Sequence, residues 1–215
     1  YKAAQLYLTA MSFWFYGLFS WKFLLILMGS ILVSYFLSFL LNKFPNSVLW
    51  NKGILLISVV FHLGVLFVCK YYGFFIENIN VAFHDDLPLR NIIMPIGISF
   101  YTFQQLSFLI DRYHKEAVHY SLLDYTAYVA FFPKLIEGPI AFHEEIISQF
   151  HDEALRHFNS ERFARGLILF VIGLGKKVLL ADTLALPVNY GFEQTYYLDT
   201  ITVILVMLAY AFEIY

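Results

Sequence analysis

Charged side chains are scarce in this chain. Asp, Glu, Lys and Arg make up 14% of its 215 residues, whereas soluble domains carry about a quarter. The formal net charge of -2 provides no basic surface for nucleic acid, so we expect no nucleic-acid partner. A single cysteine, Cys69, excludes an internal disulfide and a cysteine-based metal site. A glycine-rich phosphate loop, a Ser/His/Asp arrangement and metal-ligand spacing are also missing, so we expect no bound metal or cofactor.

Apolar and aromatic residues are abundant in this chain. The chain is 60% hydrophobic and contains 24 Phe and 16 Tyr, a composition suited to a bilayer and its interfaces. A membrane helix needs roughly 20 apolar residues, and four windows without charge have about this length. The predicted fold is therefore an all-α, polytopic transmembrane helical bundle. The predicted spans are residues 3–21, 23–42, 53–70 and 91–110.

The pattern changes after the fourth span. Nine uncharged residues separate Asp124 from Lys134, too few to cross a bilayer, and Pro133 and Gly138-Pro139 interrupt the segment. We therefore predict a re-entrant, Pro/Gly-broken element over 121–142. A cytoplasmic amphipathic segment follows over 143–165, with Ser160 predicted to cap the next helix. Further membrane segments are predicted at 166–188 and 198–215. Residues 1–215 form one predicted membrane domain, which we expect to be truncated at both ends.

Loop charges predict an orientation for these spans. If 121–142 returns to the side from which it enters, most lysines and arginines of the loops share one face. The positive-inside rule makes this face cytoplasmic, and the re-entrant element then opens toward the cytoplasm. The basic residues of that face are Lys43, Lys52, Arg112, Lys115, Arg156, Arg162 and Arg165. Lys22, Lys70 and Arg90 fall on the other face.

Two blocks of sequence resemble a known family. The first block, within 94–140, contains the segments PIGISFYTFQQLSFLIDRY and FFPKLIEGPI. It resembles the membrane-bound O-acyltransferase family, in particular its bacterial alginate O-acetylase and teichoic-acid D-alanyl transferase branch. The block RGLILFVIGLGKKVLLADTL over 165–184 fits the same branch. The family's Trp-His block, which carries its catalytic histidine, has no match in this chain. We expect it beyond Tyr215, so that the isolated chain would be inactive.

The resemblance implies a reaction and a location. We expect transfer of an acyl group, acetyl in the first instance, from a cytoplasmic thioester to hydroxyls of an extracytoplasmic polysaccharide. The implied donor is acetyl-CoA or an acyl-carrier thioester. The implied surroundings are membrane lipid in the cytoplasmic membrane of a bacterium. An accessory extracytoplasmic acyltransferase is a further expected partner. D-alanyl transfer to teichoic acid is the alternative within the family.

Charged and amide groups at membrane depth are candidates for donor contacts, because such groups are costly unless they line a pathway. Lys134 and Glu137 can form the wall of a funnel, or an ion pair that lets a broken helix lie near the interface. Lys176 and Lys177 can bind donor phosphates, or can end a half-helix and extend to the lipid headgroups. Gln104 can contact the donor or join helices through hydrogen bonds.

The remaining candidates have simpler roles. Pro95, Gly97, Pro133, Gly138 and Pro139 are predicted to be structural, since proline and glycine bend or interrupt helices. His62 lies within a span and is predicted to be a hydrogen-bonded packing residue, with proton transfer as the alternative. The other histidines lie in polar stretches and are predicted to be solvated at the surface. They are His84, His114, His119, His143, His151 and His157.

Two other classes of protein remain open from the residues alone. Helices broken by proline and glycine at membrane depth are also typical of secondary transporters. Transporters commonly contain two related halves, and this sequence contains no internal repeat. A non-catalytic membrane scaffold is the third possibility, and the dense polar content of 99–139 argues against it.

Overall fold

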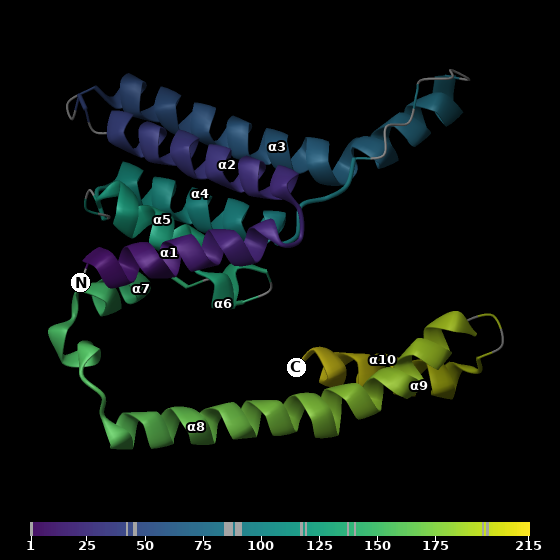
Figure 1. Ribbon diagram of the computed structural model, residues 1–215. Coiled ribbons are helices and arrows are strands. Elements are labelled where there is room, and N and C mark those ends of the chain that lie inside the picture. The colour runs from purple at the N-terminus through teal and green to yellow at the C-terminus, as the bar shows by residue number, and fades with distance from the viewer. Residues whose placement is uncertain are drawn as a thin grey trace. The chain divides into compact units, whose positions relative to one another are not determined.

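The structure is a computed structural model with helices as its regular elements, which confirms the predicted all-α class for the described part (Figure 1). It describes residues 2–41, 43–44, 47–83, 88, 92–116, 118, 120–136, 138–139, 141–194, 196 and 198–215. The chain divides into two compact units, residues 1–152 and 153–215. A single membrane domain that includes both units stays a prediction.

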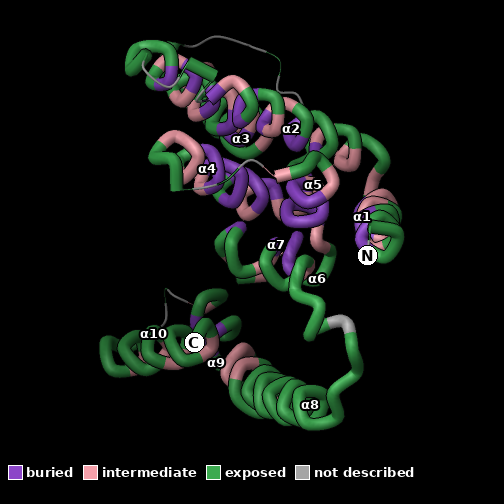
Figure 2. The backbone as a smooth tube through the Cα atoms, turned by 90° about the vertical axis from the view of Figure 1, so that its left-hand side faces the viewer, coloured by how far each residue is buried: buried purple, intermediate pink, exposed green. Residues whose placement is uncertain are grey.

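The first unit packs helices around α4. Its elements are α1 (Lys2–Gly17), α2 (Trp21–Leu40), α3 (Val48–Phe83), α4 (Ile98–His114), α5 (Leu122–Ala130), α6 (Phe132–Leu135) and α7 (His143–His151). Helix α4 contacts α2, α3 and α5, while α1 contacts α2, α5 and α6. Figure 2 shows buried residues gathered on α2, α4, α5 and α7 of this unit.

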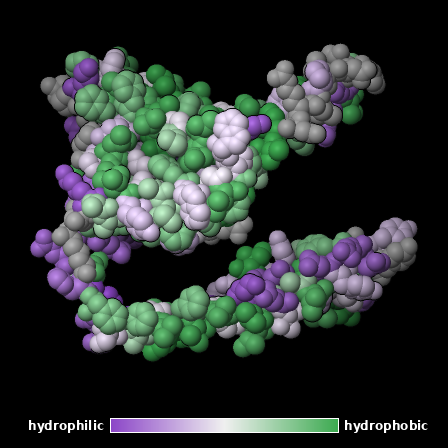
Figure 3. Space-filling view, viewed as in Figure 1, coloured by the Kyte–Doolittle hydropathy of each residue, from purple (hydrophilic) through white to green (hydrophobic). Residues whose placement is uncertain are grey.

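The core of the first unit mixes apolar residues with small polar ones. Helix α2 buries Leu27, Ser30, Ile31, Ser34 and Leu37, which recur at helical spacing and form one face. The opposite face of α2 is apolar and exposed, as the surface of a helix in lipid must be. Figure 3 shows apolar side chains over much of the visible surface of this unit. Small and hydroxyl-bearing residues therefore face the interior, where helices pack closely.

Among the described residues, two helices are long and apolar enough to cross a bilayer. They are α2 and α3, which lie over the predicted spans 23–42 and 53–70. Helix α3 continues through Lys70 to Phe83 and is 36 residues long, because one lysine does not end a helix. Helices α1 and α4 overlap the predicted spans 3–21 and 91–110 but are shorter than those spans, with 16 and 17 residues. Helix α4 begins at Ile98 and ends at His114. Where the membrane begins and ends along them stays a prediction.

The second unit consists of one long, continuous helical segment followed by a helix that packs back against its end. Helix α8 (Ser160–Gly175) follows the short 3₁₀ turn η1 (Glu153–Arg156), and continues through the π-helical turn η2 (Lys176–Ala181) into α9 (Asp182–Glu193). Helix α10 (Thr200–Ile214) packs against α9. The predicted amphipathic segment 143–165 is thus divided between α7, η1 and the start of α8. The cap of α8 is Asn159, which accepts from Arg162 N at 2.9 Å, so the prediction of Ser160 was wrong by one residue.

Candidate functional site

The interruption predicted over 121–142 is present in the structure. Helix α5 ends at Ala130, and the four-residue α6 has Pro133 in its first turn. Proline is compatible with a helix start, because the first amides of a helix have no acceptor within it. Phe132 N donates to Ser12 Oγ at 3.3 Å, which ties this start to α1. The break therefore sets α6 against α1 as a separate turn.

Glycines hold α6 on both sides. Gly97 has φ +73, and a Cβ there would lie 2.4 Å from the Leu135 carbonyl oxygen. A Cβ on Gly138 would lie 2.2 Å from Lys134 Cα. Both distances are shorter than any real Cβ contact, so only glycine permits these approaches. Nearby Pro95 accepts from Ile98 N through its carbonyl oxygen at the start of α4, and Pro139 is exposed after Gly138.

Lys134 lies on α6 and is 8% exposed. Its Nζ is 4.2 Å from the centroid of the Tyr128 ring on α5, and among the described residues it has no hydrogen-bond acceptor. Glu137, its predicted neighbour or ion-pair partner, lies outside the described residues. The structure thus places Lys134 inside the first unit as a buried cation. Its role, as part of a funnel wall or as an ion-pair partner of Glu137, stays a prediction.

Gln104 of α4 is also buried, at 6% exposure. Its Nε2 donates to the Tyr128 carbonyl oxygen at 3.0 Å, which joins α4 to α5. Helix α4 makes a second polar contact through Gln105, whose Oε1 lies 2.6 Å from Ser34 Oγ on α2. Both amides therefore act in helix packing, and a contact between Gln104 and a donor stays a prediction.

His62 completes this polar layer. Its Nε2 lies 2.6 Å from Ser34 Oγ, and its Nδ1 lies 2.8 Å from the Ser58 carbonyl oxygen. A carbonyl only accepts, so we assign the ring proton to Nδ1. Nε2 is then an acceptor, and the single proton of the Ser34 hydroxyl is shared between Nε2 and the Gln105 Oε1 atom. His62 is 2% exposed. It is the hydrogen-bonded packing residue that the sequence predicted.

His143 contradicts the prediction of a solvated surface residue. It is the first residue of α7 and is 3% exposed. Its Nε2 lies 3.3 Å from Asp111 Oδ2 on α4, and its Nδ1 lies 3.1 Å from the Tyr120 hydroxyl. An ionised carboxylate only accepts, so Nε2 carries the proton and Nδ1 accepts from Tyr120. A carboxylate that orients a histidine in this way is a common part of acid–base sites.

Aromatic rings enclose this histidine. Phe108, Tyr120 and Tyr128 have ring centroids 5.4, 5.5 and 6.5 Å from that of His143. Burial lowers the pKa of His143 from its usual 6.5, and the carboxylates of Asp111 and Glu144 raise it by less. The imidazole is therefore neutral at pH 7. The sequence signal that could have identified it is its position at a helix start, directly after the Pro/Gly break.

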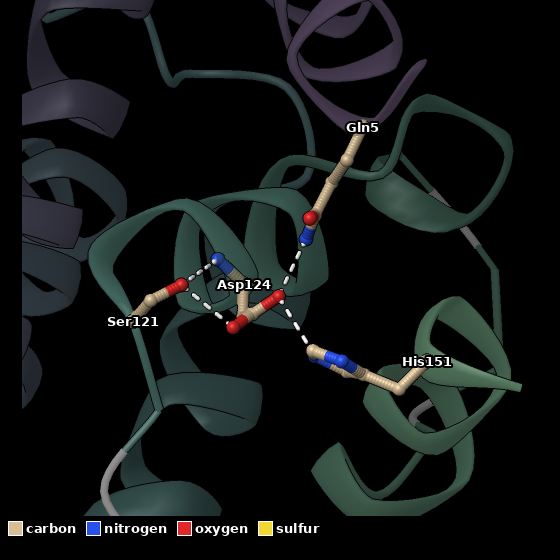
Figure 4. Close-up of polar contacts among 4 residues, drawn as sticks. All are labelled: Gln5, Ser121, Asp124 and His151. Carbon is tan, nitrogen blue, oxygen red and sulfur yellow. Dashed lines mark hydrogen bonds and ion pairs between the residues drawn. The ribbon is translucent and has the colours of Figure 1, made fainter. Parts of the chain in front are cut away.

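A second His–Asp contact lies at the other end of α7 (Figure 4). His151 Nε2 is 3.1 Å from Asp124 Oδ1, and Gln5 Nε2 donates to the same oxygen at 2.8 Å. Ser121 Oγ donates to Asp124 Oδ2 at 2.6 Å and accepts from Asp124 N at 3.1 Å, which caps α5. The Asp124 carboxylate thus joins α1, α5 and α7. The His151 side chain is half-exposed, so the surface prediction holds for it in part.

Lys176 and Lys177 lie in the second unit, on the π-helical turn η2. Lys177 Nζ is 2.8 Å from Asp182 Oδ2, and Lys176 Nζ is 4.4 Å from the centroid of the Tyr215 ring. The helix continues past both lysines, so they do not end a half-helix. Turns of this kind are frequent at functional sites. Extension of these lysines toward headgroups stays a prediction.

A cleft of about 600 Å³ adjoins these lysines within the second unit. It lies between η2 and the end of α10, and among the described residues the buried Oε2 atom of Glu213 has no hydrogen-bond partner. The lining combines two cations and one carboxylate with apolar side chains. Its residues are Gly173, Lys176, Lys177, Leu180, Ala181, Leu184, Phe212, Glu213, Ile214 and Tyr215. In the described part of the chain, His, Cys, Asp and Glu form no group of three that could hold a metal ion.

The chain is similar in sequence to known O-acetylating enzymes. Over 98% of its length the chain is 32% identical to the peptidoglycan O-acetyltransferase of Helicobacter pylori, and it covers 45% of that relative. It is 34% identical to the probable alginate O-acetylase AlgI of Pseudomonas aeruginosa, over 87% of this chain and 36% of the relative. The chain thus spans less than half the length of these relatives. No solved structure matches it. Residues 98–215 match the membrane-bound O-acyltransferase family, and the chain therefore belongs to that family.

Proposed function

We propose that the complete protein transfers an acetyl group from a cytoplasmic thioester to hydroxyls of an extracytoplasmic polysaccharide. The observation that carries this proposal is the family match over 98–215, together with relatives named as a peptidoglycan O-acetyltransferase and a probable alginate O-acetylase. The chemistry common to both is ester formation on a sugar hydroxyl. We therefore propose the acceptor as a class, a glycan outside the cytoplasmic membrane of a bacterium.

The first unit supports this role through its broken element. Helices α5 and α6 bring polar groups next to α1, α4 and α7 instead of continuing as one span. Irregular backbone at membrane depth is tolerated where it is covered by protein or lines a cavity. We propose that 121–142 is re-entrant and forms part of the wall of the cytoplasmic donor funnel.

The second unit, taken by itself, offers groups suited to the phosphates of a donor. The ammonium groups of Lys176 and Lys177 line the cleft beside η2. Phosphates of coenzyme A or of a carrier's phosphopantetheine are ligands that lysines bind well. Since Asp182 pairs with Lys177, Lys176 is proposed to make the stronger phosphate contact.

The test uses the complete protein in proteoliposomes, with acetyl-CoA labelled in the acetyl group and a glycan on the opposite side. We expect label to enter the glycan as an ester that mild base releases, and liposomes without protein to give none. Transfer of a D-alanyl group in place of acetyl would support the alternative reaction within the family. If transfer is weak, we propose to add an accessory extracytoplasmic protein to the assay. Uptake of a solute without any covalent transfer would contradict the proposal and favour a transporter.

A further inference from the structure

Lys134 is a buried cation without a hydrogen-bond acceptor in the part of the chain that the structure describes. It is 8% exposed, and its Nζ is among the buried polar atoms that lack a partner. An ammonium carries three donors and needs oxygen acceptors when water is excluded. Native proteins rarely leave such a group unpaired, and the exceptions are often functional.

The contact with Tyr128 compensates for only part of this cost. The ring face lies 4.2 Å below Nζ and attracts the cation. The Tyr128 hydroxyl donates to the Ala141 carbonyl oxygen at 3.0 Å, away from the ring face. Among the residues that the structure describes, the three donors of Lys134 therefore have no oxygen acceptor, although the charge has a favourable neighbour.

The backbone around Lys134 is closely packed on both sides. Gly138 N donates to the Lys134 carbonyl oxygen at 3.1 Å, and the Cα atom of Lys134 lies against Gly138 without room for a methyl group. On the other side, Gly97 packs on the Leu135 carbonyl oxygen. Helix α6 is thus closely packed between two glycines, which sets the point from which the Lys134 side chain leaves the backbone.

The surrounding charges indicate which oxygen would suit Lys134. The carboxylate of Glu145 on α7 interacts electrostatically with the Lys134 ammonium group. The carboxylates of Asp111 and Glu145 interact in the same way with Tyr128. A dianionic phosphate would be repelled by these carboxylates. A neutral carbonyl oxygen avoids that repulsion and still accepts from an ammonium. The tyrosine ring also suits a small apolar acyl group.

We propose that Lys134 donates a hydrogen bond to the carbonyl oxygen of the donor thioester, an inference that rests on the proposed acyltransferase function. As the acceptor hydroxyl attacks, a C–O bond forms, the C–S bond breaks and the hydroxyl proton passes to the leaving thiolate. Negative charge develops on the carbonyl oxygen between these events, and a fixed ammonium stabilises it. Lys134 itself keeps its proton throughout.

Steady-state kinetics of the complete protein test this role. Lys134→Met and Lys134→Gln should lower kcat by about 100-fold with little change in the KM for acetyl-CoA, since removal of one oxyanion donor has that size of effect. Lys134→Arg, which keeps the charge, should recover a large part of the rate. The matched control is Lys70→Met, because Lys70 also lies over a tyrosine ring, that of Tyr71 at 5.5 Å, but is exposed. Rates within threefold of wild type in both Lys134→Met and Lys134→Gln would overturn the proposal.

Chemical labelling of the wild-type protein provides a test that needs neither a variant nor turnover. A small amine-reactive reagent should modify Lys134 slowly, and mass spectrometry measures the rate on its peptide. We expect acetyl-CoA and S-acetylpantetheine, which share the thioester carbonyl, to slow this labelling at least threefold, and coenzyme A without acetyl to have less effect. Equal labelling with and without acetyl-CoA would refute the contact. Absence of glycan transfer alongside clear protection would instead count against the proposed function.

Discussion

His143 Nε2 lies 3.3 Å from Asp111 Oδ2, and this contact joins the first residue of α7 to the last turn of α4. A matching contact, between His151 and Asp124, joins the last residue of α7 to α5. The short amphipathic helix is therefore held at both ends by a histidine and an aspartate. The two contacts differ in burial, because His143 is enclosed and His151 is half-exposed.

Replacement of His143 should weaken the first unit. His143→Ala leaves the Asp111 carboxylate and the Tyr120 hydroxyl without their partner, and a buried group without a partner costs about 1–3 kcal/mol. We expect a lower Tm for the complete protein in detergent, measured by intrinsic fluorescence. The control is His157→Ala, since His157 is exposed and such changes stay within about 0.5 kcal/mol. Equal Tm values for the two variants would contradict the role of the contact.

Stability should also depend on pH through His143. Burial holds its folded-state pKa below the usual 6.5, so the unfolded chain binds more protons than the folded one as the pH falls below 6.5. The contribution of His143 is fully present above that pH and is lost as the pH falls toward its folded pKa. We expect the Tm of wild type to fall more than that of His143→Gln between pH 7.5 and 5.5. Parallel Tm curves would show that other groups cause the loss.

Gly97→Ala should be strongly destabilising. The residue has φ +73, where a side chain costs about 1–2 kcal/mol, and the added Cβ would also lie 2.4 Å from the Leu135 carbonyl oxygen. The control is Gly29→Ala in α2, where no atom lies within 4 Å of the added carbon. There we expect no loss or a gain of about 0.5–1 kcal/mol. Thermal unfolding of the two variants side by side distinguishes steric strain from a general effect of alanine.

The cap of α5 should contribute more than an ordinary cap. Ser121→Ala removes the acceptor for Asp124 N and also one donor to the Asp124 carboxylate, and loss of the cap alone costs about 1 kcal/mol. The comparison is Ser20→Ala, which removes the cap of α2 at 3.3 Å from Lys22 N without affecting a carboxylate. We expect the larger drop in Tm for Ser121→Ala. If the two drops are the same, the bond to Asp124 adds nothing.

The two lysines on η2 should act on the phosphate end of a donor. Lys176→Gln and the double variant Lys176→Gln/Lys177→Gln should raise the KM for acetyl-CoA severalfold, because both ammonium groups line the cleft. S-acetylpantetheine lacks the nucleotide phosphates, so its KM should not change. A parallel rise for both donors would indicate that the variants alter the cleft in general.

Much of the fold follows from local chemistry. Apolar windows predicted α2 and α3, and Pro133 and Gly138 marked the break around α6. Helix ends were less predictable: α3 runs on past Lys70, and the cap of α8 is Asn159 rather than Ser160. A cap depends on which side chain reaches a free amide, and neighbouring polar residues compete for that position.

The candidate site was harder to predict than the fold. The sequence spacing identified Lys134 as a candidate residue. It did not predict that Lys134 is buried over Tyr128, because burial depends on how α5, α6 and α7 pack. His143 was predicted to lie in solvent, since its neighbours in sequence are Glu144 and Glu145. Its actual partners, Asp111 and Tyr120, come from other elements.

The sequence by itself determined that this chain is helical, suited to a bilayer and interrupted after α5. Composition and the backbone limits of proline and glycine act over a few residues, so they can be read along the chain. Only the tertiary structure decided which polar groups meet, as His143 and Asp111 do, and which have no acceptor within the described part of the chain, as is the case for Lys134. Those outcomes depend on helices far apart in sequence packing together and excluding water, which sets both the distances and the energy of each polar contact.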